Sequence, residues 1–323
     1  MKTIALSIAA LALAAASATQ GQAPTTPVGR WITLGTEGGP VPSATRSQPA
    51  NVLLTADGAY IIDAGDGVSE QLAKAGVSLR QVKAVVLSHL HFDHTAGLFG
   101  ILALRWQTSI ASPLTVYGPP GTRQLVDGIL ASMGPAVEAG YAYPGEAKRP
   151  FEPGITVIEI RDGAKFDLGA THVTAAKNTH YTFAPGSAED RKFESLSLRF
   201  DTPTRSIVYT GDTGMSPAVE KLARGADLLV SEMIDFEGTV GEIRRTSPGM
   251  PPAAFSGIET HLRDHHLTPA QVGELARAAG VRAVVVTHLA APNSDGAGTV
   301  EYLRQIARAY AGPVVIARDL EAF

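Results

Sequence analysis

Short apolar runs rich in β-branched residues alternate along this chain with amphipathic stretches and with clusters of Gly and Pro. Runs of the first kind predict strands, and apolar positions three or four residues apart predict helices. The predicted strands cover residues 31–34, 51–55, 60–64, 84–88, 114–117, 155–160, 172–176, 195–200, 206–209, 227–230, 283–287 and 313–317. The predicted helices cover residues 69–75, 121–133, 216–224, 269–279 and 300–310.

The order of these elements predicts the fold class. Strands outnumber helices and fall into two batches, and helices close each batch. This order favours a sandwich of two β-sheets flanked by helices over a single doubly wound sheet. No linker-like tract or repeat divides residues 24–323, so we expect one α/β domain. Two segments rich in Gly and Pro, 135–153 and 235–264, are interpreted as insertions.

The first 18 residues, MKTIALSIAALALAAASA, combine one Lys, an apolar run and small residues. This pattern is typical of a secretory signal peptide, cleaved after Ala18 or as late as position 23. The apolar run is shorter than the roughly 20 residues that a membrane-spanning helix needs. We therefore expect a periplasmic or secreted protein whose mature form has no membrane anchor.

Composition narrows the chemistry. The chain is 45% hydrophobic and 18% charged, which excludes a disordered protein. Its formal net charge of −4 provides no general basic field for a phosphate backbone, so no nucleic-acid partner is expected. The chain has nine His and no Cys, which excludes disulfides, thiolate ligands and Cys nucleophiles.

The strongest motif is HLHFDH, which follows the predicted strand 84–88. We expect His89 and His91 to face one side of this loop, and Asp93 and His94 to face another. Imidazole nitrogens together with a carboxylate are typical ligands of Zn²⁺ and similar divalent ions. Two such half-sites side by side require further ligands from elsewhere in the chain.

Three more candidate ligands stand at the ends of predicted strands: His180, Asp212 and His288. Alone, such an Asp would be interpreted as a turn former and such a His as structural. Together with HLHFDH they predict a site for two divalent metal ions. Zn²⁺ is the preferred ion, and a set of N and O ligands also accepts Mn²⁺ or Fe²⁺.

With these motifs, and with LGTEGGP at 34–40, IDAGDG at 62–67 and VYGPPG at 116–121, the chain resembles the metallo-β-lactamase superfamily. More narrowly, it resembles the ribonuclease Z and arylsulfatase-like branch. The resemblance implies an αββα sandwich of two mixed β-sheets flanked by helices (α+β), and a homodimer. It assigns His89, His91 and His180 to one metal, Asp93, His94 and His288 to the other, and the bridging position to Asp212.

The resemblance also implies roles for two further residues. His266, in the segment HLTP, would act on the leaving group or on the transition-state charge, and Glu232 would orient it. Ser231 departs from the family pattern, in which a His usually precedes this Glu. Asp93, beside the bridging Asp212, would accept a proton from a metal-bridging hydroxide.

These observations predict an exported binuclear hydrolase of small esters, either aryl sulfates or phosphodiesters. Asp212 argues against a true β-lactamase, and the HLTP segment argues against a lactonase. A lactonase or β-lactamase-like enzyme and a non-catalytic metal-binding module remain the alternatives. Transfer-RNA processing is disfavoured, because neither insertion is a long basic arm. The segment 235–264, between Glu232 and His266, is interpreted either as a lid over the metals or as an inert loop.

Overall fold

The computed structural model describes residues 29–147, 150–151, 154–292 and 296–323. The predicted signal peptide, 1–18, and both predicted cleavage positions lie outside the described residues. The periplasmic or secreted localisation therefore stays a prediction. Among the described helices, none is both long and apolar enough to cross a membrane.

The first β-sheet is mixed and has six strands in sequence order. Its first three strands pair antiparallel, and the remaining strands join them in parallel. The strands are β1 (Arg30–Gly35), β2 (Ala50–Thr55), β3 (Gly58–Ala64), β4 (Val82–Val86), β5 (Leu114–Gly118) and β6 (Ile155–Glu159).

The second sheet is also mixed and has seven strands in the order β13-β12-β11-β10-β9-β8-β7. The pairs from β10 to β13 are parallel, and those from β7 to β10 are antiparallel. The strands are β7 (Lys165–Leu168), β8 (Thr171–Lys177), β9 (Leu196–Asp201), β10 (Ser206–Tyr209), β11 (Leu228–Ile234), β12 (Val284–Ala290) and β13 (Val314–Ile316).

Alternation along the strands builds the layers, because successive side chains of a strand point to opposite faces. Trp31 belongs to the core between the sheets, where its ring centroid lies 5.7 Å from that of Phe200 and 6.0 Å from that of Tyr209. Its neighbour Ile32 faces the opposite side and belongs to the core under the helices of the first sheet. The predicted two-sheet sandwich is confirmed.

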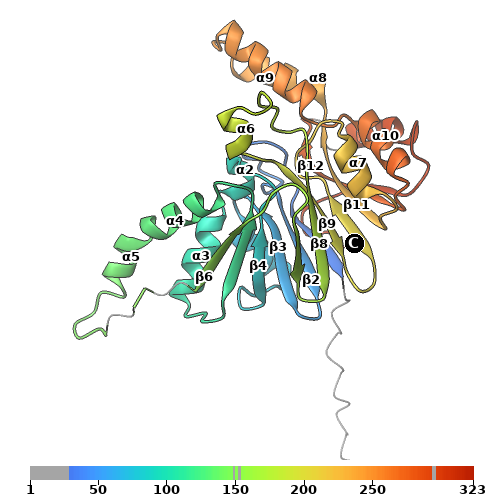
Figure 1. Ribbon diagram of the computed structural model, residues 1–323. Coiled ribbons are helices and arrows are strands. Elements are labelled where there is room, and N and C mark those ends of the chain that lie inside the picture. The colour runs from blue at the N-terminus through green and yellow to red at the C-terminus, as the bar shows by residue number, and fades with distance from the viewer. Residues whose placement is uncertain (1–28, 148–149, 152–153, 293–295) are drawn as a thin grey trace, which may run out of the picture.

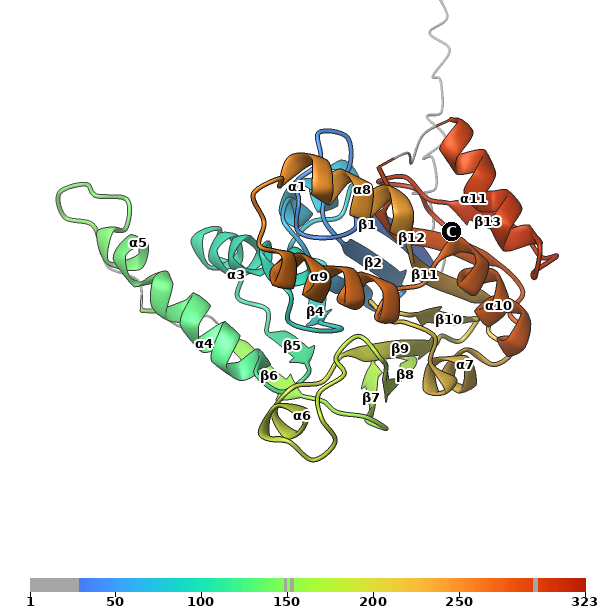
Figure 2. The same cartoon turned by 90° about the horizontal axis from the view of Figure 1, so that it is seen from above.

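Helices cover the outer face of each sheet (Figures 1 and 2). The first sheet carries α1 (Val68–Lys74), α3 (Leu98–Gln107) and α4 (Thr122–Ser132), which α5 (Gly134–Ala139) extends outward. The second carries α7 (Pro217–Ala223), α10 (Pro269–Ala279) and α11 (Ala297–Ala307).

Several elements escaped sequence prediction. Helix α3 reads LFGILALRWQ and has no continuous polar face, so it lacks the periodicity of a half-buried helix. The insertion 235–264 contains α8 (Phe236–Thr246) and α9 (Pro252–Asp264), and Pro252 occupies the first turn of α9, where Pro is tolerated. The other unpredicted elements are β7, α2 (Phe92–Thr95), α5 and α6 (Ala188–Lys192).

The core between the sheets gives a stability prediction. We expect Trp31→Ala to lower the free energy of unfolding by about 3–5 kcal/mol, because it removes a fully buried indole and leaves a cavity. It also leaves Asn51 Oδ1 without the hydrogen bond that Trp31 Nε1 donates at 3.1 Å. Urea unfolding followed by circular dichroism measures the change. The control Val315→Ala, at a side chain that is 42% exposed, should change the free energy of unfolding by less than about 0.5 kcal/mol. A Trp31 variant as stable as this control would contradict the prediction.

Candidate metal centre

The HLHFDH segment turns from β4 into α2. His91 has an extended backbone (φ −64°, ψ 151°) and immediately precedes α2, so the second half of the motif is helical rather than a loop. His89, Asp93 and His94 are buried, and His91 is partly exposed. The change from extended to helical backbone sends the two halves of the motif to different neighbours.

The first half of the motif meets His180, which follows β8. Ligand atoms of His89, His91 and His180 lie within 4.8 Å of one another. His91 Nδ1 and His180 Nε2 are 3.0 Å apart. These three imidazoles form the first cluster.

The second half meets Asp212, which follows β10, and His288 in β12. Ligand atoms of Asp93, His94, Asp212 and His288 lie within 4.8 Å of one another, and these four residues form the second cluster. His288 Nε2 is 3.1 Å from Asp212 Oδ2, and His94 Nε2 is 3.3 Å from Asp212 Oδ1. Asp212 Oδ2 also lies 3.8 Å from both His89 Nε2 and His180 Nε2. Asp212 therefore lies within 4 Å of His nitrogens from both clusters.

The donor set fits divalent metal ions. Among the described residues, eight buried side-chain atoms have no hydrogen-bond partner, and five of them belong to the two clusters: His89 Nε2, His94 Nε2, Asp212 Oδ1 and both ring nitrogens of His288. A buried polar atom left unpaired costs about 1–3 kcal/mol, so such a concentration needs an explanation. Coordination of divalent ions by imidazole and carboxylate supplies one.

Asp63 holds the second cluster in place. Its Oδ1 accepts a hydrogen bond from Ser88 N at 2.7 Å, and its Oδ2 accepts from Ser88 Oγ and Tyr209 OH, each at 2.8 Å. Oδ2 also accepts from His94 Nδ1 at 2.7 Å. That bond places the ring proton of His94 on Nδ1 and leaves Nε2 free for a metal. The neighbouring Asp66 is exposed, and its Oδ1 accepts a local hydrogen bond from Gly67 N.

The ligand residues of the two clusters differ in their charge. Burial opposes ionisation of Asp212, but His288 and His94 outweigh it and hold the pKa of Asp212 well below its usual range. Burial lowers the pKa of His89 and His180 well below the ordinary histidine value, which keeps their nitrogens available as neutral ligands.

A buried His–Glu pair lies beside the clusters. His266 Nδ1 is 2.9 Å from Glu232 Oε2, and Glu232 Oε1 accepts a hydrogen bond from Thr213 N at 2.8 Å. Burial opposes a charge on His266, yet Glu232 outweighs it and raises the pKa of His266. Burial also raises the pKa of Glu232. The pair therefore retains a proton, as a general acid requires.

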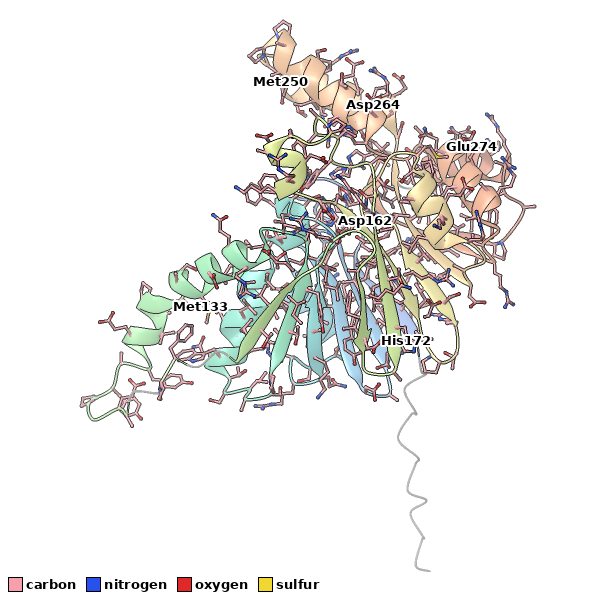
Figure 3. All side chains as sticks on the ribbon, viewed as in Figure 1. Met133, Asp162, His172, Met250, Asp264 and Glu274 are labelled. Carbon is pink, nitrogen blue, oxygen red and sulfur yellow. The ribbon has the colours of Figure 1, made fainter. Side chains whose placement is uncertain are left out.

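The structure brings further polar residues to the site that sequence reasoning left unassigned. His261 and His265 come from the end of helix α9, and the ring of His261 lies 5.0 Å from that of His180 and 5.4 Å from that of His266. Their spacing of four residues places both on one face of a helix. This spacing could have indicated a helix, but the segment was interpreted as an insertion and no helix was predicted there. His172 lies at the opposite end of the molecule (Figure 3).

Comparison with known proteins identifies the fold family. The family model of the β-lactamase superfamily domain matches residues 59–289. Ribonuclease Z of Mycobacterium sp. (strain KMS) is 30% identical over 82% of this chain and 86% of its own length. Ribonuclease Z of Mycobacterium bovis (strain BCG / Pasteur 1173P2) is 30% identical over 90% of this chain and 96% of its own.

Solved structures agree on the fold. The metallo-β-lactamase fold protein YhfI from Bacillus subtilis superposes with a TM-score of 0.64 at 18% identity, over 91% of this chain and 98% of its own. The short form of human tRNase Z gives a TM-score of 0.61 at 21% identity, with the same coverages of 91% and 98%.

The contacts of Asp63 predict that its substitution weakens metal binding. We expect Asp63→Asn to bind divalent metal about 10–100-fold more weakly, because an Asn amide offers one acceptor oxygen to the donors that now share two, and the ring of His94 is held less firmly. Elemental analysis after dialysis against a graded chelator series measures the retained metal. Asp66→Asn is the matched control and should retain metal like the unaltered protein. Equal retention by both variants would contradict the role of Asp63.

Proposed function

The chain belongs to the metallo-β-lactamase superfamily, in its ribonuclease Z branch, and we propose that it is a phosphodiesterase that cleaves RNA. The single observation that carries the proposal is the pairing of His266 with Glu232 beside both clusters, in a chain whose 30%-identical relatives are named ribonuclease Z. Metal-dependent hydrolysis follows from the family, and the phosphodiester bond and the RNA substrate are the proposal.

The prediction of a hydrolase of small esters, with its lactonase, β-lactamase-like and non-catalytic alternatives, is wrong, whereas the export of the protein stays a prediction. Curated relatives that match 80–90% of this chain are named for a ribonuclease activity. An aryl-sulfate substrate has no support in them. The error arose because the His and Asp ligands alone suit many esters, so they do not name the substrate.

The prediction that nucleic acid is not a partner is wrong for a related reason. The ribonuclease Z relatives and the tRNase Z structure are named for RNA substrates. A net charge of −4 averages over the whole chain, whereas attraction of a phosphate depends on the field at one site. Metal ions are the largest local charges in such a site, and formal sequence charge leaves them out.

We propose a metal arrangement with two divalent ions, Zn²⁺ preferred. His89, His91 and His180 would hold one ion, and Asp93, His94 and His288 the other, with Asp212 contacting both. When bound, the ions supply Lewis-acid activation of water and neutralise charge that develops on the phosphate. Asp93 is a carboxylate in this arrangement. Burial alone would raise its pKa, but His94 and His288 outweigh burial and lower the pKa to about 2.

His266 would act on the leaving group of the reaction. Its Nδ1 is held by Glu232, so its Nε2 is the nitrogen that can donate a proton to the leaving oxygen of the RNA. The Glu232 carboxylate keeps the ring oriented and stabilises its charged form. Removal of a proton-donating group of this kind costs about 10²–10⁴-fold in rate.

The RNA proposal is tested directly with metal-loaded protein. We expect cleavage of a transfer-RNA precursor, resolved by gel electrophoresis, and loss of that cleavage when a chelator removes the metal. An aryl sulfate serves as the comparison substrate and should turn over far more slowly. An RNA that stays intact while metal is bound would overturn the proposal.

The proton-donating pair has its own signature. His266→Ala should lower kcat on the same RNA by about 10²–10⁴-fold with little change in bound metal, because His266 stands beside the clusters. Glu232→Gln keeps a side chain of similar shape but removes the charge, so its loss of kcat should be smaller. Single-turnover cleavage measures both. A His266 variant with unchanged kcat would exclude the role.

A further inference from the structure

Helix α9 lies over the ends of the strands that carry the metal centre (Figures 1 and 2). Its last residue, Asp264, is fixed against the turn after β10, where the carbonyl oxygen of Asp264 approaches Gly214 so closely that a Cβ there would clash with it. Gly214 stands two residues after Asp212. The end of α9 is thereby held in a defined position relative to the clusters.

This contact brings the ring of His261 to the centre. Nitrogens of His180, His261 and His266 lie within 4.8 Å of one another, and the ring centroid of His261 is 6.2 Å from that of His91. His261 is partly exposed, whereas His180 and His266 are buried. His261 therefore lines the solvent side of the space between the first cluster and the Glu232–His266 pair.

A chain of hydrogen bonds orients the ring. Thr182 Oγ1 lies 2.6 Å from His265 Nε2, and His265 Nδ1 lies 2.8 Å from His261 Nδ1. If the Thr182 hydroxyl donates, His265 carries its proton on Nδ1 and donates it to His261 Nδ1. The proton of His261 then lies on Nε2, for which the described part of the chain provides no hydrogen-bond partner.

A third metal ion does not account for this arrangement. His180 would be a shared ligand, but its Nδ1 donates to the carbonyl oxygen of His265 at 3.2 Å. Its remaining nitrogen, Nε2, lies 3.0 Å from His91 Nδ1 in the first cluster. One nitrogen cannot ligate two ions, so a third ion shared by His180, His261 and His266 is incompatible with the first cluster.

We propose that His261 is a substrate-binding residue of the lid segment 235–264, and that its Nε2–H donates a hydrogen bond to a nonbridging phosphate oxygen of the RNA. This inference rests on the proposed function, because it takes the ligand to be a phosphodiester. Thr182 and His265 are positioning residues that act through His261.

The test uses metal-loaded protein and inorganic phosphate as the probe, measured by isothermal titration calorimetry. His261→Ala should raise the phosphate Kd about tenfold and raise the KM for the RNA by a similar factor, with bound metal unchanged. His172→Ala is the matched control, because this exposed His pairs with Asp167 at the far end of the molecule (Figure 3). It should behave like the unaltered protein.

The outcomes separate the inference from the proposed function. Unaltered protein that binds phosphate but leaves RNA intact would overturn the function, while the effect of His261→Ala on phosphate binding still tests the inference. An unchanged phosphate Kd in His261→Ala, a loss of metal in that variant, or no phosphate binding by the unaltered loaded protein at millimolar concentration would overturn the inference.

The orienting chain has a separate readout. Thr182→Val removes the hydroxyl donor and should reproduce part of the rise in phosphate Kd, whereas Thr182→Ser keeps the hydroxyl and should restore tight binding. A purely structural role of Thr182 would give equal phosphate affinities for the two variants at equal thermal stability, and that result would overturn the proposed direction of the hydrogen bonds.

Discussion

The buried carboxylate of Asp63 connects the two halves of this molecule. It stands at the end of β3 with a left-handed backbone (φ 57°), a conformation that Asp tolerates better than most residues. Its oxygens accept hydrogen bonds from the turn after β4 and from Tyr209 in the opposite sheet, as well as from His94. A carboxylate with no solvent contact is costly unless its oxygens are satisfied, so these four donors must occupy fixed positions together. The geometry of the second cluster depends on that requirement.

Much of the centre could be predicted because its signals are local. His89, His91, Asp93 and His94 lie within a single turn of chain, and His180, Asp212 and His288 each follow or end a strand with a clear apolar pattern. The carboxyl ends of parallel strands meet at one edge of a sheet, which places Asp212 and His288, from β10 and β12, near one another. The HLHFDH segment follows β4 in the other sheet, so its approach to them depends on how the two sheets pack. The two-sheet sandwich followed from the same strands.

The parts that escaped prediction depend on contacts between distant segments. His261 reaches the centre only because α9 folds back and fits against Gly214, and no local pattern shows that contact. Helix α3 has no polar side chain before Arg105, so its sequence lacks the alternation of apolar and polar faces that predicts a helix. The prediction of the substrate class was wrong for a different reason. A formal charge of −4 describes the entire chain, whereas the chemistry is confined to a few buried residues.

The hairpin of α8 and α9 leaves and re-enters the fold at neighbouring points. Ile234 N, at the end of β11, donates a hydrogen bond to Leu267 O at 2.8 Å, immediately before the capping box of α10. The segments that carry Glu232 and His266 are thus joined directly by a hydrogen bond, in addition to the connection through the hairpin. Exchange of the hairpin for one of another length would alter which substrates reach the centre and leave the proton-donating pair in place. The residues that line the approach to the centre and those that would transfer the proton therefore come from different parts of the scaffold: His261 from the hairpin, and Glu232 from β11.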